Sequence, residues 1–344
     1  MPAIHQFTAG FTPGDAISNE AVLFRKIFRS WGFDSEIFCK ERCVIASERN
    51  RVRDVDHYAA TASPEDIILL HLSIGSEVNE VFKQLPCKKA LLYHNVTPEH
   101  YFELVNKQTA NHLRRGREHV TMLANSAAVN MADSHFNASE LTALGYPNVA
   151  VLPLVLDFKM LTHDIDKRIC AKLDDGRKNI LFVGRCTPNK KIEDVLQVFA
   201  YYQKTIEPHS RLIHVGPHAG SERYYALLST MTRELGLRDV LFAGSVSQPE
   251  LNAYYASADA FLCMSEHEGF CIPLIESMSH RVPILAHASA AIPETLDGAG
   301  ILMTERKFDL CWSLAVRFGK HCSRAIWRNR PIRRQLILPI LLSA

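Results

Sequence analysis

Short apolar segments alternate with amphipathic stretches along most of this 344-residue chain, and this alternation limits the folds open to it. The segments in the first half are AIHQF (3–7), SEIFC (35–39), IILLHL (67–72), KALLYH (89–94), MADSHF (131–136) and VAVLPL (149–154). Those in the second half are NILFVG (179–184), RLIHVG (211–216), VLFAG (240–244), AFLCM (260–264), PILAH (283–287) and GILMT (300–304). In the stretches between them, such as 19–33 and 191–206, apolar residues recur three and four positions apart, which is typical of helices. Strands that alternate with helices predict parallel sheets covered on both faces.

The chain is long enough for two domains of about 150 residues each. The series of strands pauses at the polar stretch 157–178, where we place the boundary. The predicted parts are an N-terminal domain (1–157), a linker (158–176), a C-terminal domain (177–308) and an atypical basic tail (309–344). The fold class is therefore α/β, with two doubly wound Rossmann-like domains. Such sheets bind ligands at the carboxyl ends of their strands, and two facing sheets would form a cleft.

Composition indicates a globular protein, since 47% of the residues are hydrophobic and 22% are charged. A net charge of +2 gives no reason to expect a nucleic-acid partner. Nine cysteines without a C-x-x-C pair, together with a start that lacks an export signal, favour reduced thiols in the cytoplasm. No run approaches the ~18 apolar residues of a membrane span. We therefore expect a soluble cytoplasmic protein, or one peripheral on the inner face of the membrane.

The run SEHEGFCIPLIE (265–276) follows an apolar segment and precedes a helical pattern. Gly269 permits backbone angles that other residues avoid, and Pro273 fits the first turn of a helix. Free backbone N–H groups at the start of a helix bind anions. The sequence thus predicts a phosphate site formed by the amides of Phe270, Cys271 and Ile272.

Two carboxylates flank this predicted phosphate site. Glu268 lies in the loop before it and Glu276 lies one turn inside the helix. A ligand with hydroxyls at both ends and phosphates between them has this layout, and a sugar nucleotide is such a ligand. The alternative is that Glu276 balances the helix dipole and Glu268 is a solvated loop residue.

A basic loop follows the first strand of the second half. In LFVGRCTPNKK (181–191), Arg185 comes just after the strand and Lys190 starts the next helix. Arginine offers a fork for phosphate oxygens and lysine a mobile point charge, so the pair could neutralise a leaving diphosphate. A solvated basic loop is the alternative.

The second half resembles family 4 of the retaining glycosyltransferases. The resemblance rests on FVGRCTPNKKIEDVL, SEHEGFCIPLIESMSHRVPILA and SAAIPETLDGAGIL, which together span 179–302. Glu268 and Glu276 match the E-x₇-E element of that family. Three segments of the first half show a weaker similarity to the family: TPGDAISNE (12–20), LLYHNVTPEHYF (91–102) and SHFNASELTALGYPNVAVLPLVLDF (134–158). The resemblance therefore covers about residues 1–304.

The resemblance implies the GT-B fold, in which two Rossmann-like domains face each other across a cleft. The N-terminal domain would lie on the acceptor side, and the C-terminal domain would bind the nucleotide sugar. It also implies roles for individual residues. Glu268 would hold hydroxyls of the transferred hexose and Glu276 those of the ribose. Arg185 and Lys190 would stabilise the departing nucleoside diphosphate, aided by the amides of residues 270–272. In the first domain, His94 would contact the donor sugar and Gly14 would belong to a glycine loop near the donor. The resemblance implies neither a metal nor another cofactor.

The function implied is transfer of a hexose, of mannose or glucose type, from a nucleotide diphosphate sugar. The acceptor would be a glycan or a polyprenyl-linked glycan in bacterial cell-surface polysaccharide synthesis. Two alternatives stay open. The chain could be a non-catalytic or crippled sugar-nucleotide-binding protein, or a sugar-nucleotide epimerase of the same fold.

Some features depart from the family or lie outside its motifs. Cys271 stands where the family usually has glycine, and we interpret it as a buried, unreactive thiol. His214 and His218 have a spacing that would suit a metal, but we interpret them as structural. The tail after Asp309 has no acidic residue, which fits either a truncated or frame-shifted terminus or a segment that docks on anionic lipid.

The basic cluster NHLRRGREH (111–119) lies on a predicted helix of the first domain. It is either solvated helix surface or a contact with an anionic membrane through Arg114, Arg115 and Arg117.

Overall fold

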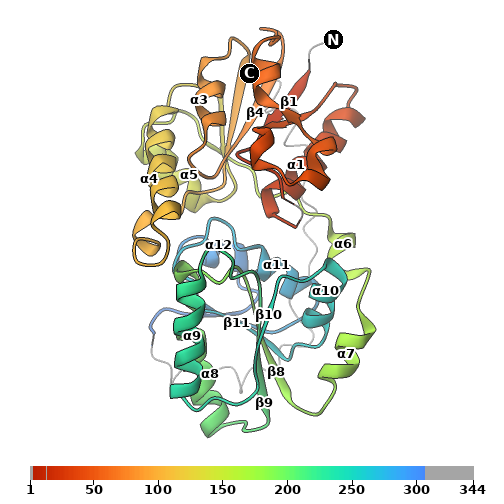
Figure 1. The fold of residues 1–344 in the computed structure, drawn as a ribbon, viewed down its shortest axis with the longest axis vertical. Coiled ribbons are helices and arrows are strands. Elements are labelled where there is room, and N and C mark those ends of the chain that lie inside the picture. Colours follow the sequence, from red (N-terminus) through yellow and green to blue (C-terminus); the bar gives the residue numbers. More distant parts are fainter. Residues whose placement is uncertain (1–2, 13, 307–344) are drawn as a thin grey trace. The chain divides into compact units, whose positions relative to one another are not determined.

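The computed structural model describes residues 3–12 and 14–306. These residues form two compact units (Figure 1). Unit 1 consists of 3–99 and 108–156, and unit 2 consists of 100–107 and 157–306. The tail 309–344 and both hypotheses about it lie outside the described residues.

Unit 1 is built on a seven-stranded sheet in the order β3-β2-β1-β4-β5-β6-β7, and every strand pair is parallel. Its strands are β1 (Ile4–Phe7), β2 (Ile37–Cys39), β3 (Arg53–Asp54), β4 (Ile67–Leu72), β5 (Lys88–Tyr93), β6 (Val129–Ala132) and β7 (Ala150–Val151). Its helices are α1 (Ala16–Ser30), α2 (Val55–Ala59), α3 (Glu77–Gln84), α4 (Lys107–Met122) and α5 (His135–Ala143). Phe24 and Phe28 of α1 are fully buried in one cluster with Ile4, Leu69 and Leu92 of the strands.

Unit 2 is built on a six-stranded parallel sheet in the order β10-β9-β8-β11-β12-β13. Its strands are β8 (Lys178–Val183), β9 (Ser210–Val215), β10 (Val240–Gly244), β11 (Ala260–Cys263), β12 (Ile284–His287) and β13 (Ile301–Met303). Its helices are α6 (Phe158–Thr162), α7 (Lys167–Leu173), α8 (Ile192–Thr205), α9 (Glu222–Glu234), α10 (Gln248–Ala256), α11 (Ile272–Ser279) and α12 (Ile292–Leu296). Figure 1 shows helices on both sides of each sheet.

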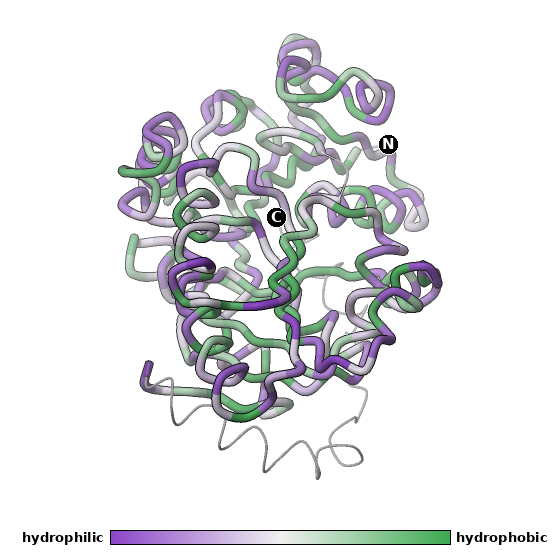
Figure 2. The backbone as a smooth tube through the Cα atoms, turned by 60° about the horizontal axis from the view of Figure 1, so that its bottom comes forward, coloured by the Kyte–Doolittle hydropathy of each residue, from purple (hydrophilic) through white to green (hydrophobic). Residues whose placement is uncertain are grey.

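The distribution of hydrophobic residues along the backbone agrees with this arrangement of strands and helices. Hydrophobic residues run along the strands, whereas hydrophilic and hydrophobic residues alternate along the helices (Figure 2). Strand β4 is buried at every position, as expected for a strand covered on both faces. The amphipathic stretch 191–206 forms α8, whose buried residues include Val195, Val198 and Phe199.

The predicted fold class is confirmed: both halves are parallel α/β units of the doubly wound kind. The facing of the two sheets across a cleft stays a prediction, as do the predicted domain boundaries. The stretch predicted as a linker contains α6 and α7, and it packs on unit 2 through the amide of Asn252, which donates to the carbonyls of Met160 and Asp164.

Three details of the strand prediction were wrong. In VAVLPL (149–154) only Ala150–Val151 forms a strand. In MADSHF (131–136) the strand ends at Ala132, because the Ser134 side chain accepts a hydrogen bond from the Asn137 amide and starts α5. The short edge strand β3 was missed, since its sequence, Arg-Asp, has no apolar residue.

Within the described residues, no helix combines the length and the apolar character that crossing a membrane requires.

Candidate functional site

The start of α11 lies where the sequence predicts a phosphate site. The helix begins at Ile272, and Pro273 lies in its first turn. The amides of Phe270, Cys271 and Ile272 have no backbone acceptor among the residues that the structure describes. A helix start with free N–H groups attracts an anion, so the predicted phosphate site has the local geometry it needs.

The left-handed residue of this loop is Cys271, with φ 71°, and not Gly269 as the sequence analysis expected. A non-glycine residue held in this region costs about 1–3 kcal/mol. The left-handed backbone explains why a glycine would suit position 271. The Cys271 thiol is 5% exposed, and its burial was expected.

Lys190 and Glu268 form a direct ion pair at the carboxyl ends of two neighbouring strands. Lys190 ends the 3₁₀ turn Pro188–Lys190 that follows β8, and Glu268 lies in the loop that follows β11. Because β8 pairs with β11, these two loops lie side by side. The Lys190 Nζ is 2.6 Å from the Glu268 Oε2, and the two side chains are 19% and 10% exposed. Burial lowers the pKa of Lys190, but the nearby Glu268 outweighs it and holds the pKa above its usual value, so Lys190 is charged.

Further hydrogen bonds fix these two loops together. The Asn189 carbonyl accepts from the Glu266 amide at 2.8 Å, and the Asn189 side chain donates to the His267 carbonyl at 3.2 Å. Asn189 is itself buried. His267 is therefore held through its backbone carbonyl. The two loops that carry the Lys190–Glu268 ion pair are therefore held together by these hydrogen bonds.

Arg185 lies at the same edge of the sheet and has an exposed side chain. It follows Gly184, whose carbonyl oxygen lies close to the backbone of Gly216 at the end of β9. A Cβ placed on Gly216 would lie 1.9 Å from that oxygen. The close contact between the ends of β8 and β9 thus fixes the backbone position from which the Arg185 side chain extends. In the described part of the chain, the Arg185 guanidinium makes no ion pair and is available to a ligand.

Glu276, one turn into α11, is buried and accepts a hydrogen bond at 2.6 Å from the hydroxyl of Tyr255 on α10. Burial raises the pKa of Glu276 above its usual value, although the Tyr255 hydroxyl opposes this. Tyr255 is itself fully buried and fixes the direction of the carboxylate. The sequence analysis missed Tyr255, because a tyrosine on an amphipathic helix has no feature that separates it from core residues.

In unit 1, Gly14 is exposed, has φ 78° and lies between β1 and α1. His94 follows β5, and its side chain is 3% exposed. Its Nε2 is 3.0 Å from the Nδ1 of His71, and its Nδ1 is 3.4 Å from the Oδ2 of Asp133. Both ring nitrogens therefore face groups of unit 1. The contact of His94 with a donor sugar stays a prediction that these contacts do not favour.

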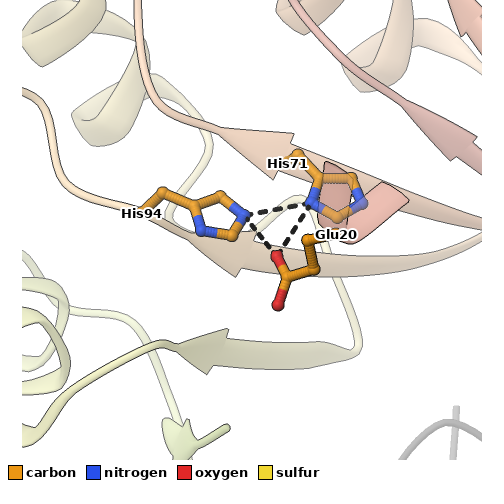
Figure 3. A group of neighbouring side chains, drawn as sticks. All are labelled: Glu20, His71 and His94. Carbon is orange, nitrogen blue, oxygen red and sulfur yellow. Dashed lines mark hydrogen bonds and ion pairs between the residues drawn. The ribbon is translucent and has the colours of Figure 1, made fainter. Parts of the chain in front are cut away.

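His94 belongs to a buried polar cluster that the sequence analysis did not identify. Glu20 of α1 and His71 of β4 complete it (Figure 3). Burial raises the pKa of Glu20 to about 7, and burial together with His94 holds the pKa of His71 well below its usual value. Burial lowers the pKa of His94, but Asp133 and Glu20 outweigh it and raise the pKa above its usual value. A polar residue inside an apolar strand, as His71 is in IILLHL, was the available signal.

Part of unit 2 is similar to a known family. Residues 166–304 match the family described as glycosyl transferases group 1. They include every site residue that the sequence analysis placed in unit 2.

Similarity to individual proteins covers only part of this chain and part of each relative. O-antigen chain mannosyltransferase B of Escherichia coli is 28% identical over 130 residues, which are 38% of this chain and 33% of that protein. The GDP-mannose:cellobiosyl-diphosphopolyprenol alpha-mannosyltransferase of Xanthomonas campestris is 33% identical over 133 residues, which are 37% of this chain and 33% of that protein. The chain thus matches about a third of the length of these relatives.

Solved structures similar to this chain cover both units. Sucrose-phosphate synthase from Thermosynechococcus elongatus has a TM-score of 0.70 at 15% identity, and the match covers 94% of this chain and 90% of that one. HepE of Anabaena in complex with UDP-glucose has a TM-score of 0.66 at 17% identity, covering 92% and 89%. At these identities the likeness concerns the fold, and it supports the GT-B architecture that the resemblance implies.

The three arginines of the basic cluster on α4 have partners within unit 1. Arg115 forms an ion pair with Glu80 at 2.6 Å, and Arg117 forms one with Glu140. Arg114 lies 3.7 Å from Glu99. These carboxylates offset much of the positive charge. The membrane contact therefore stays a prediction without support from the charge distribution.

The two histidines interpreted as structural make contacts with neighbouring groups of unit 2. The Nε2 of His214 is 2.9 Å from the Gly184 carbonyl oxygen, to which it donates. His214 is stacked on Phe182 and meets the ring of Phe242 edge-on. The ring of His218 stacks on Tyr225 instead, with centroids 4.5 Å apart.

We expect His214 to make the stability of unit 2 sensitive to acid. Burial lowers the pKa of His214 to about 4, whereas an unfolded histidine has a pKa of about 6.5. Between these values the unfolded state binds more protons, so stability is complete above pH 6.5 and falls as the pH drops toward 4. The loss is about 3 kcal/mol at pH 4. Urea unfolding of the wild type and of His214→Phe at pH 7 and pH 4.5 measures it. An identical acid dependence in both proteins would contradict the assignment.

Proposed function

We propose that the protein is a retaining glycosyltransferase that moves a hexose from a nucleotide diphosphate sugar to a glycan or polyprenyl-linked acceptor. The observation that supports this most is the buried Lys190–Glu268 ion pair next to the open start of α11. It places a fixed positive charge, a carboxylate and free amides within one small region. These are the groups that a diphosphate joined to a sugar requires.

In the proposed reaction, the bond between the anomeric carbon and the β-phosphate oxygen breaks as the acceptor oxygen bonds to the same face of that carbon. The proton of the acceptor hydroxyl passes to the leaving phosphate. Negative charge therefore grows on the diphosphate as the bond breaks. Lys190, Arg185 and the amides at the start of α11 stabilise this charge where it develops, which is usually the largest contribution to catalysis.

The two glutamates orient the donor in this proposal. Glu268 accepts hydrogen bonds from hydroxyls of the hexose while it holds Lys190 in place. Glu276 accepts from the ribose hydroxyls, and Tyr255 keeps its carboxylate in a fixed direction. Because Glu276 has a raised pKa, donor affinity is expected to fall as the pH is lowered toward that value.

Similarity to known proteins supports a proposal for the donor sugar and for the acceptor. The Xanthomonas relative is named for GDP-mannose and a diphosphopolyprenol acceptor, and the structure of HepE holds UDP-glucose. We therefore propose a hexose of mannose or glucose type and an acceptor used in cell-surface polysaccharide synthesis. No metal or cofactor has a role in the proposed transfer.

Release of nucleoside diphosphate from a panel of UDP- and GDP-sugars, with and without a lipid extract, tests the proposal. Release from one donor that depends on the extract is the expected result. An altered sugar nucleotide that forms without any acceptor would instead identify an epimerase. Binding without turnover of any donor, in folded protein, would identify a non-catalytic sugar-nucleotide-binding protein.

A further inference from the structure

The cluster of Glu20, His71 and His94 in unit 1 takes no part in the proposed chemistry, although it concentrates strong ligand groups. The side chains come from α1, from β4 and from the residue that follows β5. Figure 3 shows one oxygen of Glu20 and one nitrogen of each imidazole converging. The His71 Nδ1 and His94 Nε2 are 3.0 Å apart, and the Glu20 Oε2 is 3.8 Å and 3.6 Å from them.

These separations match three corners of a tetrahedral metal site. Zinc bonds to imidazole nitrogen and carboxylate oxygen are about 2.0–2.2 Å long, which sets tetrahedral ligand atoms about 3.4 Å apart. The separations of 3.0, 3.6 and 3.8 Å lie on both sides of that value. Shifts of a few tenths of an ångström would therefore seat an ion.

The other polar atom of each side chain faces a neighbouring group; it is hydrogen-bonded in His71 and Glu20, whereas in His94 it lies near a carboxylate without a hydrogen bond. The His94 Nδ1 is 3.4 Å from the Asp133 carboxylate, and the His71 Nε2 is 3.0 Å from the Gln6 amide oxygen. The Glu20 Oε1 accepts from the Val155 amide at 2.9 Å. Outer partners of this kind orient metal ligands and fix the tautomer of a ligating histidine.

The charges in this region also call for a cation. Glu20 and Asp133 are 1% and 2% exposed, and neither has an ion pair with lysine or arginine in the part of the chain that the structure describes. The Glu20 Oε2 has no hydrogen-bond donor there. Buried carboxylates are costly unless a positive charge or a metal compensates them.

We propose that Glu20, His71 and His94 bind one Zn²⁺ ion through Oε2, Nδ1 and Nε2. Two imidazoles and one carboxylate are a donor set that suits zinc and leaves a fourth position open to water or another ligand. This inference goes beyond the proposed function and does not depend on it, because all the ligands lie in unit 1 and binding can be read without turnover.

A second cluster, of Cys263, Glu268 and Cys271, also has metal-compatible atoms but fits a cation less well. The Lys190 ammonium already neutralises Glu268 at 2.6 Å and would repel an ion placed there. Zinc binding is therefore expected at the cluster of unit 1.

Metal titration of the full chain tests the proposal. Protein stripped with a chelator is titrated with ZnCl₂, and bound zinc is measured by elemental analysis together with the rise in melting temperature. We expect one equivalent of zinc on the wild type. His71→Gln and Glu20→Gln should weaken binding more than about 100-fold, and Asp133→Asn, which removes only an outer partner, about 10–100-fold.

His5→Gln is the matched control, since His5 is a buried histidine of the same sheet and lies outside the cluster. It should bind zinc as the wild type does. X-ray absorption of the zinc-loaded wild type should show nitrogen and oxygen ligands only, and this reading needs no variant to fold. Wild type that retains no zinc, or a zinc shell containing sulfur, would overturn the proposal.

Discussion

Replacing Lys190 with methionine is expected to lower turnover of the nucleotide sugar by about 10²–10³-fold. The substitution removes a buried positive charge beside the start of α11, where charge would grow on the leaving diphosphate. Donor binding should weaken less than turnover, because the lost interaction strengthens as the bond breaks. Steady-state kinetics with the identified donor separate the two effects.

Lys191→Met is the control for this substitution. Lys191 is the next residue, and its side chain is 25% exposed and reaches Glu193 and Glu266 at 3.6 Å and 3.4 Å. Its replacement should change turnover by no more than a few-fold, as expected for surface ion pairs. Equal turnover for Lys190→Met and Lys191→Met would show that Lys190 has no catalytic role.

Lys190→Met should also destabilise unit 2, since Glu268 then keeps a buried charge without its partner. Removing one partner of a buried ion pair lowers the free energy of unfolding by about 3–5 kcal/mol. The double variant Lys190→Met/Glu268→Gln removes both charges and should recover much of the stability without recovering turnover. This comparison separates the role in the fold from the role in catalysis.

Gly216→Ala is expected to destabilise unit 2 by about 3 kcal/mol and to lower turnover with it. The added Cβ would lie 1.9 Å from the Gly184 carbonyl oxygen, which is backbone and has little room to move. Overpacking of this kind costs about 1–3 kcal/mol, and the positive φ of 152° adds strain for a non-glycine residue. Displacement of Gly184 also moves Arg185, which follows it. The urea midpoint and the steady-state rate measure the two effects.

Gly236→Ala provides the comparison, because Gly236 also has a positive φ, of 60°, but nothing lies within 4 Å of its added Cβ. Gly236→Ala should lower the free energy of unfolding by only about 1–2 kcal/mol and leave turnover unchanged. If the two variants were equally stable, the close approach of β8 and β9 would have no energetic consequence.

The sequence predicted the parallel α/β architecture well because the information is local. A strand buried on both faces must be a short apolar run, and IILLHL (67–72) coincides with β4. In 131–136 the strand ends before the predicted position, because Ser134 caps the helix that follows. The edge strand β3 had no apolar signal at all.

The candidate site was predictable only where its residues lie close together in the sequence. The start of α11 follows from Pro273, but the residue that takes the left-handed backbone depends on where the loop turns into the helix, and this is Cys271. The pairing of Tyr255 with Glu276 and that of Glu20 with His71 and His94 join distant segments. Their contacts exist only after the sheets have formed, so no local pattern indicates them.

The most direct test of the account follows the sugar itself. The full chain is incubated with GDP-mannose or UDP-glucose labelled with ¹³C in the sugar, together with a polyprenyl-linked glycan extract, and the acceptor is analysed by mass spectrometry and NMR. We expect an acceptor heavier by one labelled hexose, joined with the anomeric configuration of the donor. An unlabelled acceptor, from protein that binds the same donor, would contradict the proposal that this chain is a glycosyltransferase acting through Lys190 and Glu268.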